Sequence, residues 1–160
     1  VVSAGGTRIN RDAAGAFVSE TGWSGSGGGP STFEPRPPYQ TVVANIVGTQ
    51  RGAPDFSFDA DPATGVSVFD STPCQGISGW LVFGGTSVSS PSLSGIVNLA
   101  ASRLGGIFAA NTAAELTNIY ANLGTANFRD IVSGTAGTFS AGPGWDFVTG
   151  VGSNQGLVGK

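Results

Sequence analysis

Histidine and methionine are absent from this chain of 160 residues, and Asp, Glu, Lys and Arg together make up only 11% of it. Typical domains carry about 25% charged residues. With no histidine and few carboxylates, little of the folding free energy should depend on acid titration, which suits an acidic medium. A secreted surface rich in serine, threonine and glycine would give the same composition, so this alternative stays open.

Cysteine occurs once, as Cys74. A single cysteine excludes an internal disulfide framework and a metal site built from cysteines alone. We expect the thiol to be a small buried hydrophobe, or else to pair with a segment outside this sequence. The first residues, Val1 to Gly6, lack an initiator methionine and the basic stretch that opens a signal peptide. This predicts a processed or excised piece of a longer protein.

Long apolar runs and basic clusters are also missing. No run approaches the about 20 residues that cross a bilayer, so we expect no membrane partner. Lys and Arg total 7 and the net charge is −3, which makes nucleic acid a poor candidate partner. The length fits a single domain or a partial domain over residues 1–160.

Glycine and proline are dense between residues 22 and 38, which excludes a regular helix or a central strand there. Trp23, Phe33 and Tyr39 are large aromatic side chains that favour an ordered loop packed against a core. Segment 39–47 is compatible with either a short helix or a strand.

The remaining pattern predicts both strands and helices. Short strands are expected at 1–4, 17–19 and 54–60, a hairpin at 66–69 and 80–83, and helices at 86–104 and 112–122. Gly105 and Gly106 should end the first helix, and Gly124 follows the second.

The segment from Trp80 to Ser87 runs from a strand through Gly84 and Gly85 into the start of a helix. Ser87 would then lie where unpaired helix amides and the positive dipole end can stabilise a developing oxyanion. Serine is also a preferred N-cap residue, so on spacing alone Ser87 could simply cap the helix.

Two later segments, 128–134 and 141–150, place Asp130 and Asp146 beside glycine-exposed carbonyls. Calcium takes six to eight oxygen ligands in flexible geometry, so two carboxylates, several carbonyls and water could form a site. Taken separately, the Gly142-Pro143-Gly144 stretch is an ordinary turn.

The stretch Gly85-Thr86-Ser87-Val88-Ser89-Ser90-Pro91 resembles the nucleophile signature shared by subtilisins and sedolisins. Ser92 stands where a subtilisin ordinarily has histidine, and the doubled glycine is more similar to sedolisins. Further similar blocks, in family order, are 2–7, 20–24 with 27–29, 39–40 and 54–65. The chain therefore resembles the C-terminal part of a sedolisin catalytic domain, which implies a subtilisin-like three-layer α/β fold with a mainly parallel sheet.

The resemblance implies functional roles for six residues. Ser87 would be the nucleophile. One calcium ion would be held by the side chains of Asp130 and Asp146 and by the carbonyls of Ile131, Gly142 and Gly144. Sedolisins act in acid on peptide bonds, so a peptide or protein substrate and a secreted or acidic location are expected.

The resemblance also implies that catalytic residues are missing. Sedolisins use a glutamate as general base, an aspartate that orients it and another aspartate at the oxyanion, all in motifs that precede residue 2 of this chain. Asp55, Asp59 and Asp61 belong to a different block, where aspartates shape loops. We expect an N-terminal chain or segment to supply the missing acids, and the chain alone to be inactive. The alternative is a non-catalytic calcium-binding structural or binding module.

Overall fold

A five-stranded sheet in the order β2-β1-β5-β11-β8 organises the chain. The computed structural model describes residues 1–103 and 109–159. The strands of this sheet are β1 (Ala4–Arg11), β2 (Phe17–Gly22), β5 (Phe56–Asp59), β8 (Phe128–Arg129) and β11 (Ser153–Asn154). The central pairs β1–β5 and β5–β11 are parallel, whereas β2 and β8 pair antiparallel with their neighbours. With the helices described below, this confirms the predicted α/β class.

The sheet is curled, so that its two edges approach each other beyond β8. The amide of Gly22, at the end of β2, donates to the carbonyl of Ser133 at 2.7 Å. Gly22 also forms an isolated bridge with Gly134. The segment that follows β8 is therefore attached to β2, although β2 and β8 lie at opposite ends of the strand order.

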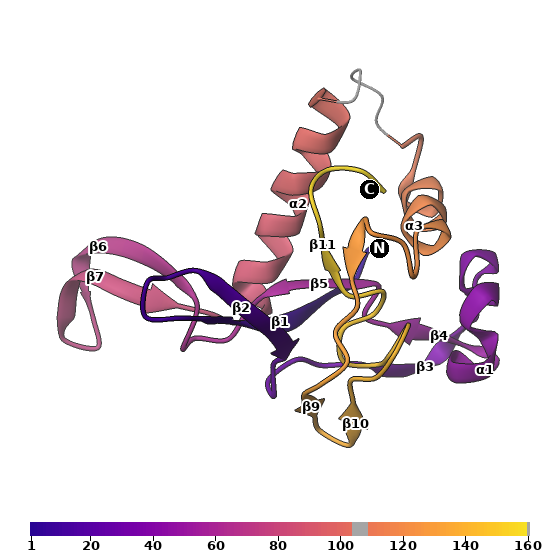
Figure 1. Cartoon of the computed structure of the whole chain (residues 1–160), viewed down its shortest axis with the longest axis horizontal. Coiled ribbons are helices and arrows are strands. Elements are labelled where there is room, and N and C mark those ends of the chain that lie inside the picture. The colour runs from indigo at the N-terminus through magenta and orange to yellow at the C-terminus, as the bar shows by residue number, and fades with distance from the viewer. Residues whose placement is uncertain (104–108, 160) are drawn as a thin grey trace.

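Three two-stranded ribbons extend from this body (Figure 1). They pair β3 (Gly29–Pro35) with β4 (Gln50–Ala53), β6 (Val66–Cys74) with β7 (Ile77–Phe83), and β9 (Thr135–Ala136) with β10 (Phe139–Ser140). The predicted hairpin is confirmed and is longer than expected. The loop prediction for 22–38 is wrong over β3. Cys74 is exposed near the tip of the β6–β7 ribbon, so the expectation of a buried thiol is also wrong.

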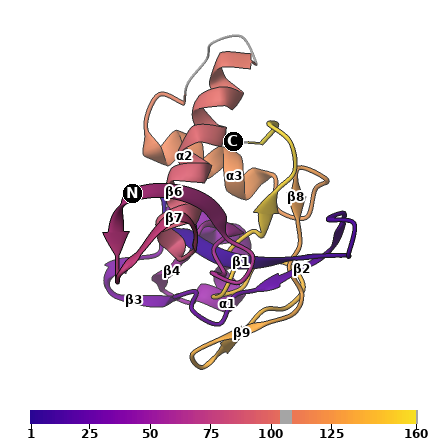
Figure 2. The ribbon, with the colours of Figure 1, turned by 90° about the vertical axis from the view of Figure 1, so that its left-hand side faces the viewer.

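Both long helices are confirmed, as α2 (Thr86–Arg103) and α3 (Thr112–Ala121), and they lie on the same side of the sheet (Figure 2). The side chain of Asn111 caps α3 by accepting a hydrogen bond from the amide of Ala114 at 3.0 Å. Segment 39–47 is helical, with a 3₁₀ turn η1 (Pro38–Val43) followed by α1 (Ala44–Val47). The predicted helix end at Gly105 and Gly106 lies outside the described residues. No helix within the described part of the chain is both long and apolar enough to cross a membrane.

The core between sheet and helices contains a polar network. Tyr120 donates from its hydroxyl to Asp55 at 3.1 Å and accepts from Gln40 at 2.6 Å and from Trp145 at 3.2 Å. Arg51 pairs with the other oxygen of Asp55 at 2.7 Å. Burial raises the pKa of Asp55 even though these partners favour its charged form. Asp55 directly precedes β5 and Tyr120 lies in α3, so the network joins these elements to the turn that carries Trp145 and fixes the position of the C-terminal segment.

Candidate functional site

Ser87 is delivered by a tight turn between β7 and α2. Gly84 packs against the loop after β5, where an added Cβ would lie 2.6 Å from the carbonyl oxygen of Ala60. Gly85 has φ of +95°, a conformation that favours glycine, and its amide donates to the same carbonyl at 2.5 Å. Both glycines are therefore needed for the chain to turn this closely into the helix.

The side chain of Ser87 is exposed in the first turn of α2. The carbonyl of Gly85 accepts the first helical hydrogen bonds, from the amides of Val88 at 2.9 Å and Ser89 at 3.4 Å. Ser87 thus lies inside the helix rather than at its cap. Ser89 donates from its buried hydroxyl to the carbonyl of Gly5 at 2.7 Å, which attaches the helix start to β1. An exposed hydroxyl on a fixed helix tip can reach a substrate carbonyl while helix amides face the same region.

Asp130 and Asp146 meet at one turn, although sixteen positions separate them in the chain. The carboxylate of Asp130 accepts from the amide of Gly144 at 2.9 Å, and that of Asp146 accepts from the amide of Gly142 at 3.1 Å. The structure therefore brings together four of the five residues predicted to bind calcium. The fifth, Ile131, follows Asp130 directly and has a buried side chain.

The Asp146 carboxylate accepts hydrogen bonds from neutral donors on both oxygens, among them the Thr149 hydroxyl at 3.2 Å. It is buried, and its second oxygen accepts from the amides of Val148 and Thr149, each at 2.8 Å. Burial nevertheless raises its pKa, because the amides compensate only part of the lost hydration. Within the described residues, no cluster of three or more His, Cys, Asp or Glu side chains could hold a metal. Two carboxylates with carbonyls remain an oxygen donor set that fits calcium and does not fit a soft metal.

Two of the other aspartates shape the loop after β5, as predicted. Asp61 accepts from the amide of Ala63 at 2.9 Å, and Asp59 accepts from the hydroxyl of Thr64 at 2.9 Å. This loop is the one against which Gly84 and Gly85 turn. Asp55 instead belongs to the buried core network. None of the three is assigned a catalytic role.

Asp59 should make the fold more stable in acid. Its side chain is only 7% exposed, and burial raises its pKa. The folded state then binds more protons than the unfolded state, so its contribution to the unfolding free energy grows as the pH falls through the raised pKa. In thermal unfolding with a chelator present, wild type should gain stability relative to Asp59→Asn between pH 7 and about pH 4. A relative loss over that interval would contradict this assignment.

The sequence did not indicate a role for Glu20, whose carboxylate has several partners in the structure. Glu20, in β2, accepts from Thr7 and Ser153 and pairs with Arg129 at 3.5 Å. Glu20 lies in segment 20–24, which is one of the segments similar to sedolisins. That similarity does not indicate its contacts, which depend on the pairing of strands in the sheet.

Comparison with known proteins identifies the family. No profile of a known protein family matches the chain. Sedolisin from Pseudomonas sp. (strain 101) is 33% identical over 169 residues, covering 96% of this chain, and kumamolisin from Bacillus sp. (strain MN-32) is 34% identical over 176 residues, covering 98%. This chain belongs to the sedolisin family. It spans only 27% and 30% of those two relatives and corresponds to their C-terminal part.

A solved sedolisin structure has the same fold as this family member. Pseudomonas sedolisin, a serine-carboxyl proteinase complexed with two molecules of pseudo-iodotyrostatin, superimposes with a TM-score of 0.81 at 31% identity. The match covers 96% of this sedolisin-family chain and 43% of that chain. The likeness confirms the predicted fold.

Proposed function

We propose that this chain is the C-terminal part of the catalytic domain of an acid-acting serine peptidase, with Ser87 as its nucleophile. The observation that carries the proposal is the exposed hydroxyl of Ser87 in the first turn of α2, behind the turn of Gly84 and Gly85. Sedolisin is described as a serine-carboxyl proteinase, and its fold matches over nearly the whole of this chain.

In the proposed reaction, the Ser87 oxygen attacks the carbonyl carbon of a peptide bond and forms an ester. A carboxylate base takes the hydroxyl proton and passes it to the departing amine as the C–N bond breaks. Water then hydrolyses the ester and restores the hydroxyl. Helix amides near Ser87 would stabilise the oxyanion. The glutamate base and its aspartate partners are supplied by the preceding part of the catalytic domain.

Exposed apolar side chains support the proposal that the preceding part of the catalytic domain packs against this chain. On α2, Leu93 and Ala100 are buried against the body, whereas Leu99 is exposed. A cavity of about 300 Å³ also opens between the helices and the sheet, lined by Val2, Leu93, Val97, Ile119 and other residues.

The β6–β7 ribbon also exposes apolar side chains. Its exposed side chains include Phe69, Trp80 and Val82 on one face and Val66 and Phe83 on the other. An isolated two-stranded ribbon is marginally stable in water. We propose that the N-terminal part of the domain covers these surfaces.

We also propose that calcium binds to the side chains of Asp130 and Asp146 and to the carbonyls of Ile131, Gly142 and Gly144. When bound, the ion would neutralise the two carboxylates and hold the turn in place. The peptidase would work in a secreted or otherwise acidic location, where the missing oxyanion aspartate can stay protonated and donate a hydrogen bond.

Activity assays with two polypeptides test the proposed function. At about pH 4, near the carboxyl pKa range, this chain alone should not cleave a denatured protein, because an unactivated serine hydroxyl is a weak nucleophile. A polypeptide that also carries the preceding part of the domain should cleave it. If the longer polypeptide folds and binds calcium but remains inactive, the chain is a non-catalytic module instead.

Substitution of the calcium ligands gives a separate prediction. Asp130→Asn and Asp146→Asn should each lower calcium affinity at least roughly tenfold, since changes in outer-shell partners alone can cost 10- to 100-fold. Titration calorimetry on chelator-treated protein at neutral pH measures this loss. Asp12→Asn, in the exposed turn between β1 and β2, is the matched control and should leave the affinity unchanged. Equal affinity in all four proteins would reject the site.

A further inference from the structure

Glu20 connects three strands of the curled sheet. Its carboxylate lies on β2, and the side chain is 6% exposed. One oxygen accepts from the hydroxyl of Thr7 on β1 at 2.5 Å, and the other accepts from the hydroxyl of Ser153 on β11 at 2.6 Å. Two neutral donors leave the negative charge of this carboxylate available to a cation.

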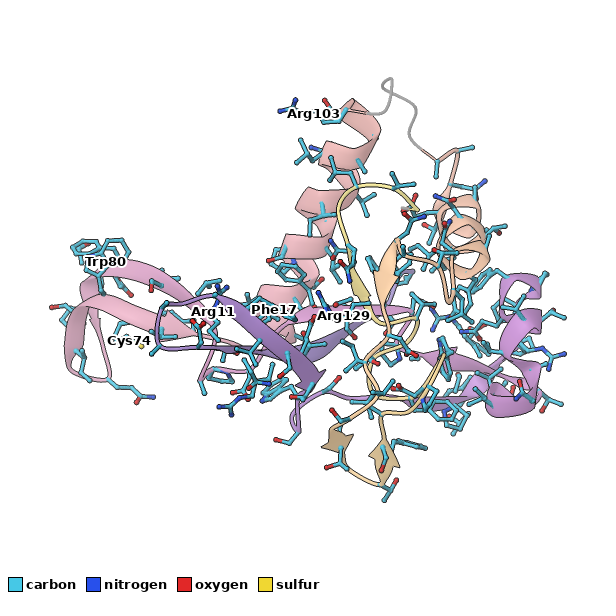
Figure 3. The ribbon with its side chains drawn as sticks, in the orientation of Figure 1. Arg11, Phe17, Cys74, Trp80, Arg103 and Arg129 are labelled. Atoms are coloured by element: carbon cyan, nitrogen blue, oxygen red, sulfur yellow. The ribbon has the colours of Figure 1, made fainter. Side chains whose placement is uncertain are left out.

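Arg129, on β8, is that cation. Its Nε lies 3.5 Å from the Ser153-bonded oxygen of Glu20. The guanidinium carbon lies 4.2 Å from the ring centroid of Phe17, and both side chains are labelled in Figure 3. Two residues of β2 thus hold the arginine, one by charge and one by a cation–π contact.

Arg129 immediately precedes Asp130 in the chain, so its charge belongs to the segment that carries this candidate calcium ligand. A positive charge on that segment repels a metal ion bound at Asp130, unless a negative charge compensates it. The backbone bond from Gly22 to Ser133 also keeps this segment against β2. Glu20 is therefore placed to compensate the only cationic side chain adjacent in sequence to the candidate calcium ligands.

We propose that Glu20 sets the calcium affinity of the Asp130–Asp146 turn by neutralising Arg129. Glu20 binds no calcium in this scheme and acts only through the arginine. The inference rests on the proposed calcium site, but it makes a distinct claim about charge.

Calcium titration calorimetry on the whole chain at low salt tests the claim with four proteins. Glu20→Gln keeps the shape of the side chain and removes its charge, and should weaken calcium binding roughly three- to tenfold. Arg129→Gln should bind calcium as tightly as wild type or more tightly. The double variant should return to within about twofold of wild type, because the uncompensated cation is gone. Glu34→Gln, at an exposed position of β3, is the charge-matched control and should have no effect.

The salt dependence of calcium affinity distinguishes an electrostatic role of Glu20 from a purely structural one. Screening lengths fall from about 10 Å at 0.1 M salt to about 3 Å at 1 M, so the difference between wild type and Glu20→Gln should shrink in 1 M potassium chloride. A purely structural role would lower stability in every variant, would persist in salt and would not be rescued by the second substitution.

Three outcomes would overturn the inference. Unchanged affinity in Glu20→Gln would do so, as would a double variant as weak as Glu20→Gln alone. If Glu20→Gln does not fold, Arg129→Gln decides alone, and weaker calcium binding in that variant contradicts the proposal. Absence of calcium binding by wild type would reject the proposed site itself, which distinguishes the two failures.

Discussion

Ser87→Ala, in a polypeptide that joins this chain to the preceding part of the catalytic domain, is expected to abolish peptide hydrolysis. Losing the nucleophile of a serine peptidase typically lowers the rate roughly 10⁴- to 10⁶-fold. Ser87 is exposed, so the substitution removes the reacting oxygen without opening a cavity in the core. The measurement is kcat/KM on a peptide substrate at about pH 4, near the carboxyl pKa range, compared with thermal unfolding of the same proteins.

Ser94→Ala is the matched control for this result. Ser94 lies farther along α2, is exposed and donates only to the carbonyl of Ser90 at 3.0 Å. Its loss should leave kcat/KM within about twofold and the unfolding temperature nearly unchanged. Retained activity in Ser87→Ala would remove Ser87 from the mechanism.

Trp145→Ala should produce the largest loss of stability, about 3–5 kcal/mol of unfolding free energy. The indole is 2% exposed, packs edge-on against Phe147 with centroids 4.9 Å apart, and donates to Tyr120 at 3.2 Å. Truncation would leave a large cavity and would remove one of the two hydrogen bonds that the Tyr120 hydroxyl accepts in the core. Because Trp145 lies between Gly144 and Asp146, the same change should also loosen the candidate calcium turn.

Urea unfolding measures this loss, and Trp80→Ala provides the comparison. Trp80 is 73% exposed on the β6–β7 ribbon and touches Phe69 with centroids 5.5 Å apart. Its truncation in the isolated chain should cost only about 0.5–1 kcal/mol. If the two tryptophan variants lose equal stability, the core described here is wrong.

The elements with local signals were predictable from the sequence. Helix α2 follows from the apolar spacing after Ser87, and α3 follows from its Leu116–Tyr120 face and from Gly124 just after it. Strand β3 was not predicted because Gly29 and Pro30 are residues typical of loops. Pairing with β4, whose residues lie about twenty positions later, gives this segment its extended form in a two-stranded ribbon that tolerates proline.

The candidate site also has parts that local sequence predicts and parts that depend on distant contacts. The turn at Gly84 and Gly85 is local, so the placement of Ser87 followed from the residue order. The meeting of Asp130 with Asp146 depended on resemblance to a known family, since neither turn by itself indicates a cation. The Glu20 contacts were not predictable, because Ser153 is 133 positions away and reaches Glu20 only through the curl of the sheet.

Trapping the acyl intermediate tests most directly whether Ser87 is the nucleophile. The longer polypeptide would be mixed at acidic pH with an activated acyl peptide, quenched, digested and mapped by mass spectrometry. We predict one acyl group, located by fragmentation on Ser87 and absent from Ser87→Ala. An acyl group on another residue, or an unchanged adduct in Ser87→Ala, would contradict the account.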